Sequence, residues 1–336
     1  MLRYTQQQMD AILANRAIFN RQQTGLASQF GLSNVSASAL VGNAMPVPKD
    51  VWGDWDKESV QLQRSILTVF ADLAGSVSQP MNIGKLIQYF RTVSDSGDVN
   101  ISLDGQSDAP TDQPVYDYHG TPLPIIDSTF SYGWRQMAAA QSEGETLDTD
   151  GRDNSIRRVS EKLEGLVLDG DSKIVVGGAQ LYGMRNHPKR NTRSTGETLN
   201  GATGAQWKAE IVALLKLLHG DNFKRANVTL YVNFDDWFYA GNTDYSTQYP
   251  NKTIAQAVRE IEGVGQVVAA DKVNANEIFG LVKDRSVVRL LSGMPVSTIA
   301  KFRGDPMAPY NFQTLGAAAL QIKFDAEDNC GLAHSS

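Results

Sequence analysis

The segment formed by residues 95–127 restricts the fold of this chain more than any other. It contains seven aspartates and four prolines and has no lysine or arginine. Two β-like runs within it, VNISLD (99–104) and PVYDYH (114–119), predict a long two-stranded ribbon. Because an isolated two-stranded ribbon is marginally stable in water, we expect this one to lie on another surface.

The remaining composition is that of a globular chain. Its 336 residues are 41% hydrophobic and 20% charged, and the length favours about two domains. The single cysteine, Cys330, excludes an intrachain disulfide. The net charge of −6 argues against a protein that coats nucleic acid with its whole surface. We find neither an apolar run long enough to span a membrane nor a signal-peptide pattern.

Periodic apolar residues predict mixed helices and strands. Helices are expected over 54–73, from about 155 to Gly170 after a polar turn, over 207–219 and over 253–264. Thr203 and Gln206 form a potential capping box before the third helix. Strands are expected over 84–97, 124–136, 226–233, 266–270, 277–282 and 286–291. Residues 292–336 should add two strands and a small polar tail, whereas residues 1–48, with a net charge of +2, look like an arm.

Catalytic constellations are missing from the sequence. It has no phosphate-binding loop, no G-x-S-x-G elbow and no H-E-x-x-H pair, and its four histidines are scattered. Asp148, Asp150 and Asp153 resemble a calcium loop, but the sixth position is Asp153 rather than glycine. We therefore predict no catalytic residues, no cofactor, no metal site and no enzymatic activity.

A basic stretch, MRNHPKRNTR, occupies residues 184–193. Two interpretations stay open, a solvated loop or a complement for an acidic surface on a neighbouring subunit. Nucleic-acid binding by this stretch alone is disfavoured, because no aromatic residues are interleaved with its charges.

Three segments, in this order, resemble encapsulin shells and related phage coat proteins. PKDVWGDWDKESVQLQRSILTVFADLAG (48–75) is similar to their first helix, which bears tryptophan and aspartate. QLYGMRNHP (180–188) resembles a G-[LM]-x-N-x-P element that follows the family's spine helix. TIAQAVREIEGVGQVVAA (253–270) resembles the inner helix and strand of the central domain. The resemblance covers roughly 49–330.

The resemblance implies the α+β, Hong Kong 97-like major capsid fold of tailed bacteriophage heads. Its parts would be an N-terminal arm, a peripheral domain with a spine helix, an extended β-hairpin loop and an axial domain. They map to 1–48 (arm), 49–94 (peripheral domain, first part), 95–127 (extended loop), 128–170 (peripheral domain with spine helix), 171–291 (axial domain) and 292–336 (strands that rejoin the peripheral domain).

The implied function is that of a structural major capsid protein, which assembles into an icosahedral phage head around double-stranded DNA. The alternative is an encapsulin shell around an enzyme cargo. A soluble enzyme built on residues 171–290 is disfavoured by the missing catalytic groups. The implied partners are other copies in pentamers and hexamers, portal protein, scaffold or decoration proteins, and DNA by weak nonspecific contact, without a membrane. The protein would be made in the host cytoplasm and reside in the virion.

In such a shell the acidic ribbon would lie across a neighbouring subunit. Charge matching would set its register, while apolar burial would supply most of the strength. The predicted intersubunit residues are the acids Asp104, Asp108 and Asp112, the apolar anchors Val115, Tyr116, Tyr118 and Leu123, and the bases Arg152, Arg157, Arg158, Arg185, Lys189, Arg190 and Arg193.

Overall fold

The computed structural model describes residues 67–336 except 98, 100, 102–111, 144–147 and 221–224. These residues divide into two compact units, and each is described by itself. The first comprises the described parts of 126–159 and 296–316, and the second those of 67–125, 160–295 and 317–336. The predicted arm over 1–48 and the start of the helix predicted over 54–73 lie outside the described residues.

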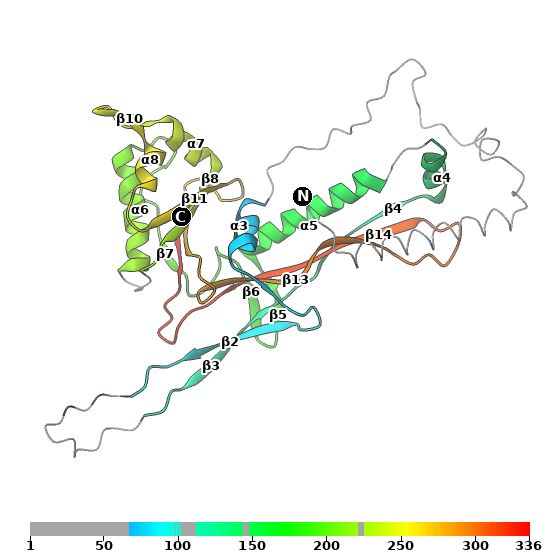
Figure 1. The fold of residues 1–336 in the computed structure, drawn as a ribbon, viewed down its shortest axis with the longest axis horizontal. Coiled ribbons are helices and arrows are strands. Elements are labelled where there is room, and N and C mark those ends of the chain that lie inside the picture. The colour runs from blue at the N-terminus through cyan, green and yellow to red at the C-terminus, as the bar shows by residue number, and fades with distance from the viewer. Residues whose placement is uncertain (1–66, 98, 100, 102–111, 144–147, 221–224) are drawn as a thin grey trace, which may run out of the picture. The chain divides into compact units, whose positions relative to one another are not determined.

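A five-stranded sheet with the order β11-β8-β12-β15-β7 organises the second unit (Figure 1). Its strands are β7 (Asn191–Arg193), β8 (Val228–Asn233), β11 (Val264–Ala270), β12 (Ile278–Val282) and β15 (Leu332–Ser335). The interior strand β8 pairs parallel with β11 and antiparallel with β12. Both faces of β8 are buried, since Leu230 belongs to one apolar cluster and Tyr231 to another. The strand is therefore apolar on both faces except for buried Thr229 and the terminal Asn233.

Helices α6 (Gly204–His219), α7 (Phe234–Asn242) and α8 (Ile254–Arg259) belong to this unit. The predicted capping box at Thr203 is confirmed, and Thr253 forms a second one before α8. Such boxes satisfy free backbone N–H groups at a helix start. Two expectations were wrong: α7 was not predicted, and the supposed polar tail is the buried strand β15.

Helices α3 (Thr68–Ser76) and α5 (Asp148–Asp169) meet where α3 begins. Leu67, which precedes α3, offers no capping side chain. Instead the Glu164 carboxylate, which is buried, accepts hydrogen bonds from the backbone N–H groups of Val69 (3.0 Å) and Phe70 (2.8 Å). A residue about 95 positions away thus caps the helix, which no local pattern could predict.

The first unit is built around an antiparallel pair. Strand β4 (Ile126–Tyr132) pairs with the first half of β14 (Tyr310–Ile322), and Phe130 stacks on Phe312 at 5.1 Å. Helix α4 (Trp134–Glu143) follows β4, so the strand predicted over 124–136 ends earlier than expected. The polar turn predicted before the next helix is also shorter, because α5 already begins at Asp148.

Strand β1 (Ser78–Pro80) pairs with β13 (Val288–Ala300) in a four-stranded sheet of order β1-β13-β14-β4. The remaining strands form two-stranded pairs, which are β2 (Ile87–Val93) with β3 (Tyr116–Pro122), β5 (Gly170–Val176) with β6 (Ala179–Tyr182), and β9 (Asp244–Ser246) with β10 (Tyr249–Thr253). In the described part of the chain, no helix is long and apolar enough to cross a membrane. Nor do the described residues contain a group of three or more metal-ligating side chains.

Two glycines lie back to back where α5 ends, as the sequence predicted for Gly170. Gly170 has φ +65°, and a Cβ on it would lie 2.5 Å from the backbone nitrogen of Gly183. We expect Gly170→Ala to lower the free energy of unfolding by roughly 1–3 kcal/mol. The added methyl group would clash with backbone atoms, which cannot move aside as the end of a side chain can. Urea unfolding would measure the loss.

Gly165 supplies the matched control within the same helix. A Cβ added there meets nothing within 4 Å. Gly165→Ala should therefore raise stability by about 0.5–1 kcal/mol, since alanine favours the helix. Equal effects of the two substitutions would contradict the steric argument.

Candidate interaction surface

The ribbon formed by β2 and β3 has two different faces. Its register places Tyr89 opposite Gly120, Arg91 opposite Tyr118, and Val93 opposite Tyr116. Opposite residues of an antiparallel pair share a face, and the side alternates along each strand. The predicted strand 84–97 is thus confirmed, but the ribbon partner expected at 99–104 is wrong, because β3 pairs with residues 87–93.

One face of the ribbon packs on other residues of the second unit, to which the ribbon itself belongs. Thr92 and Thr121 are buried, and Gln321, itself fully buried, donates from Nε2 to the carbonyl oxygen of Gln88 at 3.1 Å. The ring of Phe324 contacts the rings of Phe90 and His119, with centroid distances of 5.5 Å and 4.5 Å. These contacts fix the base of the ribbon.

The opposite face is exposed and mostly aromatic. Tyr89, Tyr116 and Tyr118 are 54%, 48% and 63% exposed, and Val93 is 43% exposed. The Arg91 guanidinium lies 4.8 Å from the centre of the Tyr116 ring, which holds that ring in place. A contiguous apolar stripe on a folded surface is typical of an interaction site. This face, defined by Tyr89, Arg91, Val93, Tyr116 and Tyr118, is called the tyrosine face below.

A groove of about 670 Å³ runs beside the ribbon base. Its aromatic lining includes Phe324, and its charged lining consists of Asp117, Asp325, Asp328 and Lys189. We call it the ribbon groove. Because three carboxylates face one lysine, which already pairs with Asp328 at 2.5 Å, the groove favours positively charged partners.

His187 lies buried in the wall of the ribbon groove. Its ring meets Tyr182 edge-on at 5.7 Å, and its Nδ1 accepts a hydrogen bond from the Lys189 N–H at 3.3 Å. Burial, and then the charges of Arg190 and Lys189, lower the pKa of His187 from 6.5 to about 4. The imidazole is therefore neutral in the folded protein at pH 5–7.

This depressed pKa predicts an acid-sensitive stability. The unfolded chain binds a proton near pH 6.5 and the folded one near pH 4, so the contribution of His187 is complete above pH 6.5 and is lost as pH falls toward 4. We expect a loss of at most about 3 kcal/mol over that window. Urea midpoints between pH 7 and 5 would measure it. His187→Asn, which retains an acceptor near Nδ1 but cannot titrate, should flatten the profile, and an unchanged slope would refute the assignment.

The predicted acidic and apolar contact residues differ in their exposure. Asp104 and Asp108 lie outside the described residues. Asp112, Val115, Tyr116 and Tyr118 are exposed. Leu123 is only 7% exposed and is covered by its own chain.

The predicted basic residues divide similarly. Arg152, Arg157 and Arg158 lie on α5. Arg152, which contacts Asp153 at 3.4 Å, and Arg157 are half-buried, whereas Arg158 is exposed. The other four have partners within their own chain: Arg185 with Glu277, Lys189 with Asp328, Arg190 with the carbonyl of His187, and Arg193 with Glu210. Within the single chain, these four charges therefore contribute to the stability of the subunit itself.

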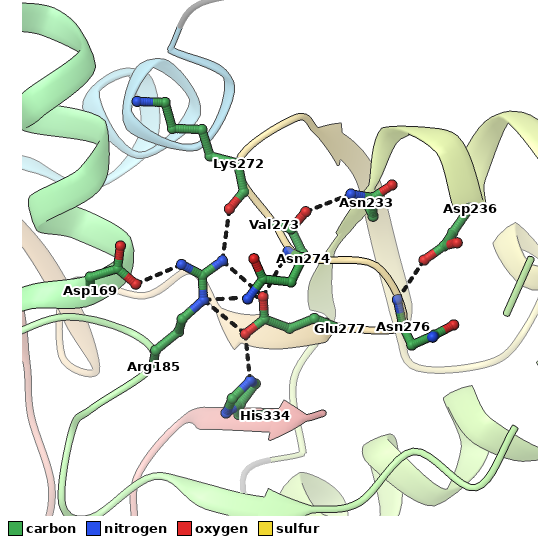
Figure 2. Close-up of polar contacts among 10 residues, drawn as sticks. All are labelled: Asp169, Arg185, Asn233, Asp236, Lys272, Val273, Asn274, Asn276, Glu277 and His334. Carbon is green, nitrogen blue, oxygen red and sulfur yellow. Dashed lines mark hydrogen bonds and ion pairs between the residues drawn. The ribbon is translucent and has the colours of Figure 1, made fainter. Parts of the chain in front are cut away.

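Arg185 is the centre of a polar cluster in the second unit (Figure 2). It donates to Glu277 from Nε (2.9 Å) and Nη2 (2.8 Å) and to Asp169 from Nη1 (2.6 Å). His334 of β15 contacts the same Glu277 carboxylate at 2.8 Å and stacks on Phe279. The cluster joins the end of α5, the loop before β12 and the last strand.

The charge of Glu277 is stabilised although the residue is 3% exposed. Burial by itself raises the pKa of Glu277. Hydrogen bonds from His334, Arg185 and the Asn274 N–H outweigh this effect, so the pKa falls from 4.5 to about 2. Sequence reasoning missed Glu277 and His334 because they are far from Arg185 in the chain and belong to no local motif.

Comparisons with solved structures place this architecture among capsid proteins. The capsid of Myoviridae phage XM1 matches 84% of this chain and 96% of its own, with TM-score 0.67 and 12% identity. A structure from Mycobacterium phage Bobi covers 85% and 95%, with TM-score 0.59 and 12% identity. The virus-like particle from Pyrococcus furiosus covers 80% and 92%, with TM-score 0.53 and 11% identity. No curated protein matches the sequence.

The fold is therefore the Hong Kong 97-like capsid fold, which confirms the predicted α+β fold class. The same similarities confirm the resemblance to phage coat proteins and encapsulin-like shells. Within that fold class, the chain belongs to the family of unknown function DUF6260, whose model matches residues 38–335.

Proposed function

We propose that this chain is a structural major capsid protein that assembles into an icosahedral phage head enclosing double-stranded DNA. The observation that carries this proposal is the extent of the fold match. Nearly the whole XM1 capsid chain, 96% of it, has a counterpart here. On this view the protein is a virion component without enzymatic activity, made in the bacterial host cytoplasm.

Contacts between neighbouring copies would run through the ribbon. The tyrosine face supports this, because it is exposed in the single chain and has the composition of an interface core. Val115, Tyr116 and Tyr118 stay as anchors, whereas buried Leu123 is left out. Apolar burial contributes about 25 cal/mol per Å², so the rings would supply most of the strength.

The charge match would involve the α5 arginines. Asp112, with Asp104 and Asp108, would face Arg152, Arg157 and Arg158 of a neighbour. Arg158 is exposed, although Arg152 and Arg157 also contact Asp153 and Asn154 of their own chain. The four bases of 184–193 are less suited, because none is fully exposed and each has a partner in its own chain. Each exposed pair adds only about 0–1 kcal/mol, so these charges would set register rather than strength.

The proposed subunit organisation follows the fold class. Residues 1–48 would be an arm and 95–127 an extended loop. Residues 49–94 and 128–170 would form the peripheral domain, 171–291 the axial domain, and 292–336 strands that rejoin the peripheral domain. Copies would gather in pentamers and hexamers, with portal protein, scaffold or decoration proteins as partners and only weak nonspecific contact with DNA.

An encapsulin shell around an enzyme cargo is the second candidate. The similarity to the Pyrococcus furiosus virus-like particle favours it, although the TM-score of 0.53 is below the 0.67 for the XM1 capsid. A cargo enzyme, rather than nucleic acid, would then fill the particle.

Electron microscopy of the expressed full chain tests the proposal. We expect closed particles with icosahedral symmetry. Particles from infected or induced cells should contain nucleic acid, measured by the ratio of absorbance at 260 and 280 nm and by nuclease-protected DNA. Particles that copurify one enzyme instead would favour the encapsulin, and a stable monomer at all concentrations would refute both.

A further inference from the structure

An almost fully exposed phenylalanine stands in the turn between β13 and β14. Phe302 is 89% exposed, and Met307 in the same turn is 55% exposed. Lys301 and Arg303 flank Phe302, so the turn presents a ring between two positive charges. Large exposed apolar side chains are common singly, but a ring held out by a rigid turn is a typical interface anchor.

The turn is held in shape by its own contacts. The Arg303 guanidinium lies 3.9 Å from the centre of the Tyr310 ring and donates to the carbonyl oxygens of Asp305 and Pro306. The Asp305 carboxylate accepts from the Met307 N–H at 2.8 Å. Arg303 Nη1 has no hydrogen-bond partner among the described residues. A pre-ordered turn loses little entropy when it binds.

The ribbon groove has the complementary properties. Its volume of about 670 Å³ lies within the range of pockets that hold ligands larger than one aromatic side chain. Its lining is aromatic, with Phe324 and Tyr182, and its formal charges are three aspartates and one lysine. The aromatic ring of Phe302 suits the aromatic lining of the groove. The positive charges beside that ring are opposite in sign to the net negative charge of the groove.

We propose that the β13–β14 turn of one copy docks in the ribbon groove of a second copy, with Phe302 in the groove and Lys301 toward Asp117, Asp325 and Asp328, while Arg303 keeps its contacts within the turn. This proposal rests on the proposed self-assembly and adds a specific contact to it. The contact joins two different surfaces, so it is heterologous, and repeated rotation can close it into rings.

Two variants with one added cysteine each, mixed in one assembly, test the contact. One chain carries Gly304→Cys, in the same turn as Phe302, whose ring is retained, and the other carries Ala326→Cys or Ala179→Cys, at two different positions in the groove lining. Native Cys330 is buried and present in both chains. Because the two new thiols are on different molecules, a disulfide between them reports contact between copies. We expect a covalent dimer on a non-reducing gel with at least one groove position, and none with Phe238→Cys in place of Gly304→Cys.

Assembly of Phe302→Ala gives the second measurement. Loss of the ring should reduce particle yield about tenfold or more, because burying such a side chain contributes more than the free energy equivalent to a factor of ten. If wild-type particles form but neither cysteine pair links and Phe302→Ala assembles normally, the groove contact is wrong while the capsid proposal stands. A link between Gly304→Cys and a different protein in the particle would assign the turn to another partner and also overturn the proposal. If the wild type forms no particles, the proposed function itself fails.

Discussion

The double variant Val93→Ala/Tyr116→Ala is expected to lower the yield of assembled particles at least tenfold while the subunit stays folded. Val93 and Tyr116 lie opposite each other on the tyrosine face, and both are more than 40% exposed in the single chain. Burying side chains of this size is worth about 1.5–3 kcal/mol each, and 1.4 kcal/mol is a factor of ten. Neither residue lines the ribbon groove, so the result concerns the ribbon contact alone.

Tyr116→Phe is the matched control for this experiment. It retains the ring under the Arg91 guanidinium and removes only the hydroxyl. Particle yield, measured by sedimentation and microscopy, should stay near that of the wild type. Circular dichroism and unfolding of the unassembled double variant would show that its fold is intact. Normal assembly of the double variant would overturn the ribbon contact.

Glu277→Ala should cause the largest loss of subunit stability, about 3–5 kcal/mol. The carboxylate accepts from Arg185, His334 and the Asn274 N–H, and it is nearly inaccessible to water. Its removal leaves the Arg185 charge and a buried imidazole without their main partner. Because the cluster joins α5 to the last strand, β15 should lose protection from hydrogen exchange first.

Glu260→Ala is the control, because Glu260 also forms an ion pair, with Lys252, but is 66% exposed at its side chain. That substitution should cost no more than about 1 kcal/mol. The pH dependence gives an independent check. Since the folded pKa of Glu277 is about 2 and its ordinary value 4.5, its contribution is complete above pH 4.5 and is lost as pH falls toward 2. Similar losses for Glu277→Ala and Glu260→Ala would contradict the role of burial.

Several elements could be predicted because their signals are local. The capping box at Thr203 and the glycine end of α5 depend on residues within one helical turn. The prolines of the ribbon, its many acids and the weakness of two strands alone predicted that it needs other surfaces, and its base does pack on Gln321 and Phe324. The partner of strand β3 was predicted wrongly. Both 87–93 and 99–104 contain β-forming residues, and the packing of 87–93 on Gln321 and Phe324 favours that segment.

Other elements depend on contacts between distant residues. The short strand β15 carries a histidine and a serine, which are typical of a polar tail in the sequence. In the fold, His334 is satisfied by Glu277 and stacks on Phe279, so the strand can be buried. Basic residues 185–193 looked like a surface complement, but Glu277, Asp328 and Glu210 neutralise three of them inside the chain.

By itself, the sequence determined the mixed helix and strand content, the absence of familiar catalytic motifs, and a ribbon with too little core of its own. The tertiary structure decided which strand pairs with β3, which face of the ribbon is exposed, and which charges are already neutralised. The physical reason is distance along the chain. Turns, caps and periodicity act within a few residues, whereas burial and ion pairing depend on which distant segments the fold brings together.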